Sequence, residues 1–439
     1  MIEEKVNTKI NSSLSKRLIK NSFYTGLSLA FVGIVPFAFN FLVARTFGKE
    51  TLGSINIALS FCLITTIFVT NFFGSSGNKY LAEYRGSKSL KQFILVFKIM
   101  IIGPIIILTI IGAILIVNWD YFSQSFSLQP NLLFPLLFYI LARSFYILFR
   151  RALYGADLVK SYALNEVASS IAMLSALIYV CFSNQSTLLI ECYILAYSLF
   201  IVLGLKTFIK NFKSITHGMV ANGNLKNKQV IKKFANYGFV SMIGTVASTS
   251  TGYISVIIIG VYLNHSDAGL YSSVLSVISI LMFMPKLFTQ VFLPEFSKLF
   301  GEGNKQQIFQ IFNQTTSLMV GISAIICLSV FFFAEYILSA FGSDFTNATI
   351  ILQIMLPSVF IRMISIPFVS FLSGTKYVLY PNIGGIIILL VSTLCWVILV
   401  PDYQLKGIAI GYTVGIIVGI GYQILTAIFK IKSFDKEDT

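Results

Sequence analysis

The stretch RTFGKETLGSINIALSF, from Arg45 to Phe61, recurs in altered form as VYLNHSDAGLYSSVLSV, from Val261 to Val277. Gly53 of the first stretch aligns with Gly269 of the second, 216 positions further along the chain, and the same offset aligns a Leu-Ser pair. Each stretch ends one long apolar run and begins the next. A likeness produced by apolar composition alone is the alternative, because few positions are identical. The two stretches indicate a chain built from two related halves.

Composition makes the bilayer the main solvent of this chain. Of its 439 residues, 56% are hydrophobic and 11% are charged, whereas soluble domains carry about 25% charged residues. The formal net charge of +15 comes from lysines and arginines. They lie mostly in short segments between apolar runs, the pattern that orients membrane helices. We therefore expect an integral membrane protein that does not bind nucleic acid.

Twelve apolar runs are long enough to cross a bilayer, which takes ~20 residues per helix. Lipid offers the backbone no hydrogen-bond partners, and the runs are too long for barrel strands, so we expect helices. The runs lie at about 23–44, 55–74, 93–117, 131–150, 161–183, 186–208, 234–262, 269–292, 311–333, 346–373, 377–400 and 405–429. The sequence thus predicts an all-α integral membrane protein with twelve transmembrane helices.

The distribution of basic residues predicts the topology. With both termini in the cytoplasm, the outer loops hold few basic residues, namely Arg45, Lys49 and Lys406. The basic cytoplasmic linker 209–233 then separates an N-terminal six-helix lobe at 1–208 from a C-terminal lobe at 234–439. Because six is even, the lobes form parallel repeats, an arrangement that places a central cleft between them.

A polar stripe lies inside the run LFYILARSFYILFRRALYG, from Leu137 to Gly155. Positions three, four and seven apart share a helix face, which groups Tyr139, Arg143, Tyr146 and Arg150. An arginine in hydrocarbon costs about 2.5–3.5 kcal/mol. Arg143 lies ~10 Å along the helix from Arg150, so it either faces a wet cleft or extends to the membrane surface.

Arg362, in the run 346–373, is the stronger candidate for a functional cation. It lies ~21 Å before Lys376 at helical rise, which is too deep to reach the surface easily. The repeat offset places it within one turn of Arg143. Lys286 is a further candidate, which lines the cleft or extends to the inner surface. No helix carries an acid near its centre, so these basic side chains favour an anionic substrate, and arginine matches phosphate oxygens.

Motifs of soluble catalytic sites are absent. The chain has no GxxxxGK[ST] or H-E-x-x-H pattern, and neither His217 nor His265 has a metal-ligand neighbour at useful spacing. The outer loops are too short for a catalytic domain. We therefore expect no enzyme, no cofactor and no bound metal.

The chain resembles the polysaccharide-exporter branch (O-antigen flippase, Wzx-like) of the multidrug/oligosaccharidyl-lipid/polysaccharide transporter superfamily. The likeness lies in the two predicted lobes and in three segments, ARTFGKETLGSINIALSF, GNKYLAEYRG and DAGLYSSVLSV. It implies a MATE-like fold with a cationic cavity in the bacterial inner membrane. It also implies a flippase that moves an undecaprenyl-diphosphate-linked oligosaccharide, an O-antigen unit or another surface polysaccharide unit, to the outer leaflet by alternating access. Membrane lipids and other polysaccharide assembly proteins are its candidate partners.

A cation-coupled multidrug antiporter of the same superfamily is the alternative. Such members typically carry an acid in the first or seventh helix. Neither helix has a central acid here, which disfavours drug antiport and leaves the energy source open.

Overall fold

The computed structural model describes residues 2–220, 227–283, 305–375, 377 and 379–433, with the isolated positions 288, 292 and 296. Side chains in the first helix are described from Phe23 onward. Within these ranges the chain is helical and forms no β-strand. The helices are α1 (Ile2–Gly86), α2 (Leu90–Val117), α3 (Trp119–Ser125), η1 (Pro130–Leu132), α4 (Leu133–Gly155), α5 (Val159–Ser183), η2 (Ser186–Leu188), α6 (Leu189–Ile215), α7 (Asn227–Tyr262), α8 (His265–Leu281), α10 (Lys305–Phe332), α11 (Ala334–Ser339), η3 (Ser343–Ala348), α12 (Thr349–Ile364), α13 (Ile366–Gly374) and α14 (Leu379–Ser433).

Long apolar helices dominate the fold, which confirms the predicted all-α membrane protein. In the described ranges, nine helices are long and apolar enough to cross a membrane. The two longest, α1 and α14, each join two helices at one non-helical residue, Gly48 (φ 80°) and Gln404 (φ 44°). Both residues lie between predicted spans, and the glycine adopts its positive φ without a Cβ clash. The number twelve stays a prediction.

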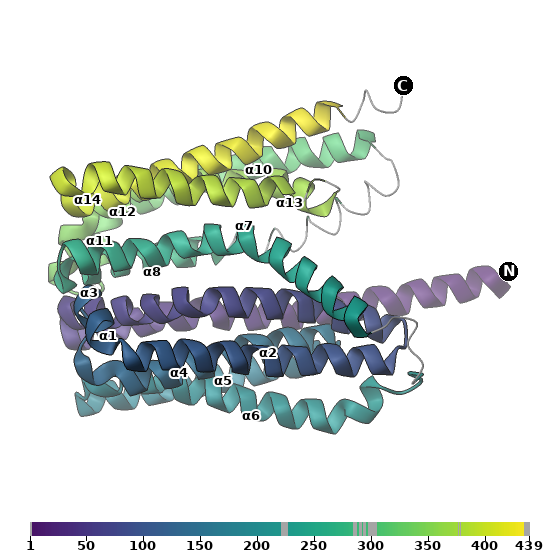
Figure 1. Cartoon of the computed structure of the whole chain (residues 1–439). Coiled ribbons are helices and arrows are strands. Elements are labelled where there is room, and N and C mark those ends of the chain that lie inside the picture. The colour runs from purple at the N-terminus through teal and green to yellow at the C-terminus, as the bar shows by residue number, and fades with distance from the viewer. Residues whose placement is uncertain are drawn as a thin grey trace.

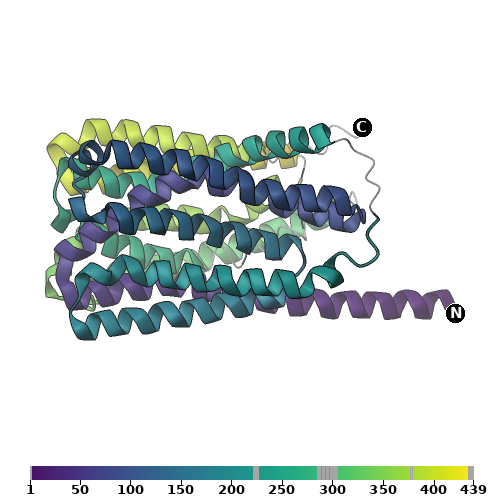
Figure 2. The same ribbon diagram turned by 60° about the horizontal axis from the view of Figure 1, so that its bottom comes forward.

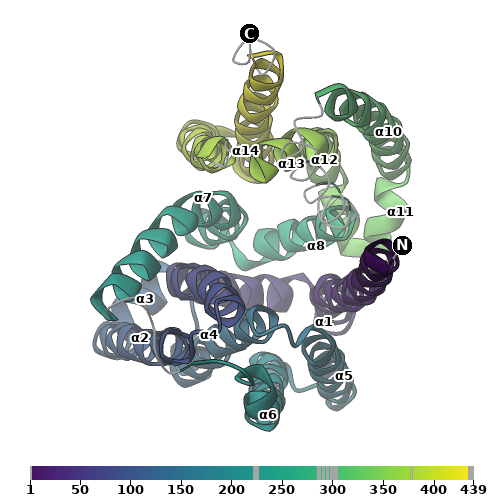
Figure 3. The ribbon, with the colours of Figure 1, turned by 90° about the vertical axis from the view of Figure 1, so that its right-hand side faces the viewer.

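The helices run side by side along one bundle axis (Figures 1 and 2). Helices α1 to α6 gather on one side and α8 to α14 on the other, as the end view shows (Figure 3). The start of α1 and the end of α14 lie at the same end of the bundle (Figure 1). This arrangement agrees with termini on one side of the membrane.

Helix α7 contacts both sides of the bundle. Near its start, the Ser76 hydroxyl of α1 donates to the Phe234 carbonyl at 2.8 Å. Further along α7, Gly244 packs closely on Asn382 of α14. The lobe boundary predicted at residue 234 therefore falls in a segment that packs on α1.

The two halves meet most closely where α1 crosses α8. A Cβ added to Gly53 would overlap the carbonyl oxygen of His265, and a Cβ added to Gly269 would overlap the carbonyl oxygen of Lys49. The two glycines are 216 positions apart, and so are Lys49 and His265. The contact is therefore nearly symmetric between the halves, with the offset found in the sequence. A side chain at either glycine would prevent this backbone approach.

Polar contacts surround this crossing. The Asn40 side-chain amide donates to the Ser276 hydroxyl at 2.7 Å, and the Asn56 amide donates to Asn40 at 3.0 Å. An ion pair joins Lys49 to Asp344 at 3.7 Å. The Asn40–Ser276 bond and the Lys49–Asp344 pair link the first half of the chain to the second, and the Asn56–Asn40 bond holds Asn40 in place within α1.

Candidate functional site

The turn between α4 and α5 determines how these two helices, which carry the candidate site, lie against each other. Asp157 adopts a positive φ of 61°, and its carboxylate lies 3.1 Å from the Arg85 guanidinium. Arg85 also donates to the Ala156 carbonyl at 2.8 Å. Held by these contacts, the turn brings α5 back alongside α4. Tyr162 and Glu166 share one face of α5.

Tyr139, Arg143, Tyr146 and Arg150 lie on one face of α4, as their spacing predicts. The two tyrosines are buried, and the two arginines are partly exposed. This face packs against α5 and α6, which add further aromatic and acidic groups. We call the resulting set the α4 cluster; it comprises Tyr139, Arg143, Tyr146, Arg150, Tyr162, Glu166, Tyr193 and Tyr197.

Among the described residues, the hydrogen-bond and ring contacts of Arg143 are to a tyrosine, and no acid lies within ion-pair distance. Its guanidinium donates to the Tyr197 hydroxyl at 2.8 Å and lies 5.4 Å from the centre of the Tyr197 ring. Tyr253 of α7 lies near enough to interact electrostatically with Arg143. No ion pair to Arg143 forms within the described residues. Within the described part of the chain, Arg143 therefore has no ion-pair partner, and Glu166 acts on it only at longer range.

Arg150 is paired, which the sequence did not reveal. Its Nε lies 3.4 Å from Glu166 Oε2, and its Nη2 donates to the Tyr162 hydroxyl at 2.9 Å. The Tyr146 hydroxyl donates to the other Glu166 oxygen at 2.6 Å. The expectation of a basic face without acids therefore does not hold at Arg150. The spacing of Tyr162 and Glu166, four residues apart on α5, is the signal that could have found this partner.

Arg362 lies on α12, in the other half. Its Nε is buried and has no hydrogen-bond partner among the residues that the structure describes. The helix ends two residues later, at Ile364, and α13 begins with Pro367 in its first turn. Within the described chain, no hydrogen bond or ion pair joins Arg362 to the α4 cluster. Lys286 lies outside the described residues.

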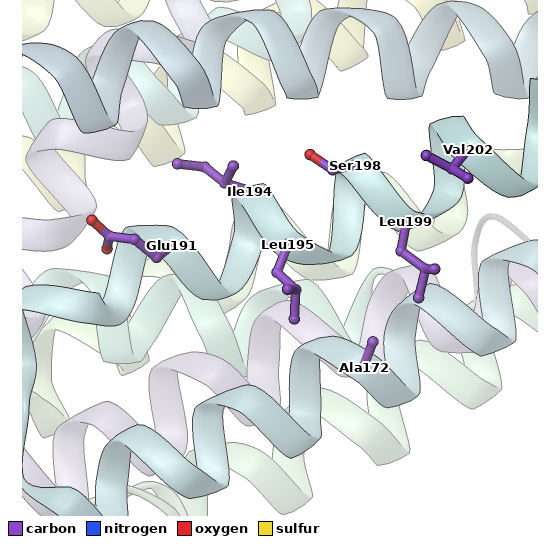
Figure 4. Close-up of a pocket in the computed structure, with 7 residues that line it drawn as sticks. All are labelled: Ala172, Glu191, Ile194, Leu195, Ser198, Leu199 and Val202. Atoms are coloured by element: carbon purple, nitrogen blue, oxygen red, sulfur yellow. The ribbon is translucent and has the colours of Figure 1, made fainter.

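A separate groove of about 570 Å³ lies on the outer surface of α5 and α6 (Figure 4). Aliphatic side chains form most of its wall, and it shares no residue with the α4 cluster. Its lining consists of Ala172, Glu191, Ile194, Leu195, Ser198, Leu199 and Val202. Such a surface suits contact with lipid chains and offers no cation for an anionic substrate.

Fold and sequence comparisons together define a multi-pass membrane transporter of the multidrug/oligosaccharidyl-lipid/polysaccharide (MOP) superfamily. The chain belongs to the polysaccharide biosynthesis protein family, whose model matches residues 18–300. The MatE family model matches residues 241–401. Both families consist of transporters and flippases rather than enzymes. No curated protein sequence matches the chain significantly.

Solved structures support the same fold. An inward-facing multidrug resistance MATE family transporter of the MOP superfamily aligns with a TM-score of 0.72 at 13% identity, covering 93% of this chain and 96% of that one. The lipid II flippase MurJ, in an inward closed conformation, aligns with a TM-score of 0.71 at 15% identity, covering 95% and 90%. An outward-facing MATE transporter aligns with a TM-score of 0.68 at 14% identity, covering 95% and 96%. The predicted MATE-like fold is confirmed.

Proposed function

We propose that this protein is a flippase for an undecaprenyl-diphosphate-linked oligosaccharide, an O-antigen or other surface polysaccharide unit, in the bacterial inner membrane. The observation that carries the proposal is the Arg143 guanidinium, which donates to a tyrosine hydroxyl and, among the described residues, forms no ion pair with an acid. Membership of the polysaccharide biosynthesis family supports a sugar-containing substrate. The likeness to MurJ, a lipid II flippase, supports one that is linked to lipid.

Recognition would centre on the charged diphosphate. An unpaired arginine within the membrane is costly, by about 2.5–3.5 kcal/mol on insertion scales, and an anionic ligand offsets that cost. Tyr197 holds the Arg143 guanidinium in place, so its remaining N–H groups are available to phosphate oxygens. Arg362, with its unpartnered Nε, would supply a second cation, and Lys286 a third.

Transport would follow from motion of the two lobes, 1–208 and 234–439, with the linker 209–233 between them and both termini in the cytoplasm. The sugar would cross between the lobes while the polyprenyl tail stays in lipid. Opening one end requires the crossing of Gly53 and Gly269 to separate, together with the Asn40–Ser276 hydrogen bond. No covalent step is needed.

Complementation tests this proposal. In a strain that lacks the gene, Arg143→Ala and Arg362→Ala should each sharply reduce surface polysaccharide, and the double variant should abolish it. Arg45→Ala is the matched control, because Arg45 is exposed and stacks 5.9 Å from the Phe41 ring, away from the α4 cluster. Normal polysaccharide from the double variant, at normal membrane levels, would contradict the assignment.

Multidrug antiport is the second candidate. The MatE match over residues 241–401 and the fold shared with MATE transporters favour it. It predicts drug resistance when the protein is overproduced, with normal polysaccharide in the deletion strain. The opposite pair of results supports the flippase.

A further inference from the structure

Glu166 is a buried acid that the proposed transport cycle does not yet use. Its side chain is 4% exposed, while the Arg150 side chain beside it is 18% exposed. An anion that approaches the α4 cluster therefore meets the Arg150 guanidinium before it meets Glu166. The Glu166 carboxylate pairs with the buried side of the Arg150 guanidinium.

Burial disfavours a negative charge on Glu166, and the neighbouring basic and hydroxyl groups among the described residues oppose that effect. From α4 they are Arg143, Tyr146 and Arg150; Tyr162 lies on its own helix, and Tyr197 of α6 interacts with Tyr146. Among the described residues, Glu166 is the one acid that pairs with this face. The carboxylate and a phosphate of the substrate would thus compete for the charge of the same guanidinium.

We propose that Glu166 is the resting counter-ion of Arg150, and that the substrate's phosphate replaces it while Glu166 takes up one proton. This inference rests on the proposed function, because it needs an anionic substrate at Arg150. The Arg150 Nε faces Glu166 in an ion pair at 3.4 Å, and its Nη2 donates to Tyr162. Drawing Arg150 toward a phosphate would leave a buried carboxylate without its counter-ion, which is strongly disfavoured.

Protonation of Glu166 removes the cost of leaving a buried carboxylate without its counter-ion. The only covalent change is one new O–H bond. The proton comes from water, the Glu166 carboxylate becomes a carboxylic acid, and Arg150 exchanges a carboxylate oxygen for a phosphate oxygen. The Tyr146 hydroxyl, 2.6 Å from Glu166, can bond to either form, since a hydroxyl both donates and accepts. Glu166 is therefore a positioning residue whose charge depends on whether the site is loaded.

The sign of the pH dependence follows directly. Binding that takes up a proton is favoured at low pH, so the affinity should fall as the pH rises, by up to about tenfold per pH unit for one proton. Glu166→Gln cannot take up the proton. This variant should bind the ligand more tightly than the wild type at high pH. Its affinity should depend on pH only through the titration of the ligand itself.

The test uses the purified full chain in lipid nanodiscs with farnesyl diphosphate as the probe, and Kd is measured from pH 6 to pH 8.5. Glu166→Asp keeps a titratable group and should retain a steeper pH dependence than Glu166→Gln. Equal pH profiles for the wild type and Glu166→Gln would overturn the exchange. Absence of binding in the wild type at every pH would instead contradict the proposed function.

A measurement on the wild type alone guards against a variant that fails to fold. Calorimetric titrations at pH 7.5, in buffers of different ionisation enthalpy, report the protons taken up per ligand bound. The free diphosphate is largely ionised at this pH, so we expect a net uptake approaching one proton. Zero uptake, or proton release, would overturn the exchange.

Discussion

The crossing of Gly53 and Gly269 offers the sharpest structural test. A Cβ on Gly53 would overlap backbone atoms of His265 and Gly269, and backbone cannot rotate away as a side chain can. Gly53→Ala therefore forces α1 and α8 apart in the described conformation. The same change at an open helical position would only raise helix propensity.

The magnitude follows from opposing effects. Alanine stabilises a helix interior by roughly 0.5–1 kcal/mol relative to glycine. Overpacking costs about 1–3 kcal/mol, and separation also strains the Asn40–Ser276 hydrogen bond, worth about 0.5–1.5 kcal/mol. The cost outweighs the gain, so Gly53→Ala should destabilise this conformation by about 0.5–4 kcal/mol.

Two assays measure this effect. Thermal unfolding in nanodiscs should show a lower midpoint for Gly53→Ala and an unchanged or higher one for the control Gly321→Ala, whose Cβ would meet no atom within 4 Å. Ser276 is buried, so a cysteine placed there should react faster with a thiol reagent once Gly53 is replaced. Equal midpoints for both glycine variants, with no change in labelling, would refute the close-approach explanation.

Three further changes have defined outcomes. Tyr197→Phe removes the 2.8 Å hydrogen bond to Arg143 but keeps the ring, so surface polysaccharide should fall less than in Arg143→Ala; an equal loss would contradict this. A double-mutant cycle between Lys49, which is partly exposed, and Asp344, which is exposed and 3.7 Å away, should give a coupling of about 0.2–1 kcal/mol in unfolding experiments. Trp396→Ala should cost about 3–5 kcal/mol of stability, because the buried indole also donates to a carbonyl at 3.0 Å; unfolding at the wild-type midpoint would contradict that burial.

The fold was largely predictable because lipid imposes one dominant constraint. Apolar runs must become helices, and their lengths follow the bilayer. Even the breaks within α1 and α14 fall between predicted spans, at Gly48 and Gln404. What the sequence did not reveal is that α7 begins against α1 through Ser76, since packing between distant helices has no local signal.

The candidate site shows the same division between local and tertiary information. The stripe from Tyr139 to Arg150 follows from helical spacing alone, and the structure shows it on one face of α4. The pairing of Arg150 with Glu166 depends on the turn at Asp157, which sets how α5 returns. Glu166 lies near the start of α5 and is nevertheless buried, because α4 packs beside it.

The two arginines of this stripe are consequently not equivalent in mutagenesis. Arg150→Ala strips a buried carboxylate of its counter-ion, which costs about 3–5 kcal/mol, so lost activity there mixes binding with folding. Arg143→Ala leaves only the Tyr197 hydroxyl without a donor, and Tyr197 lies near other aromatic rings that keep it packed. We therefore expect Arg143→Ala to reach the membrane in normal amounts and Arg150→Ala in reduced amounts, as measured by immunoblotting of membranes. If both variants accumulate equally, the ion pair is not structural, and the loss of polysaccharide in either variant can be assigned to substrate binding.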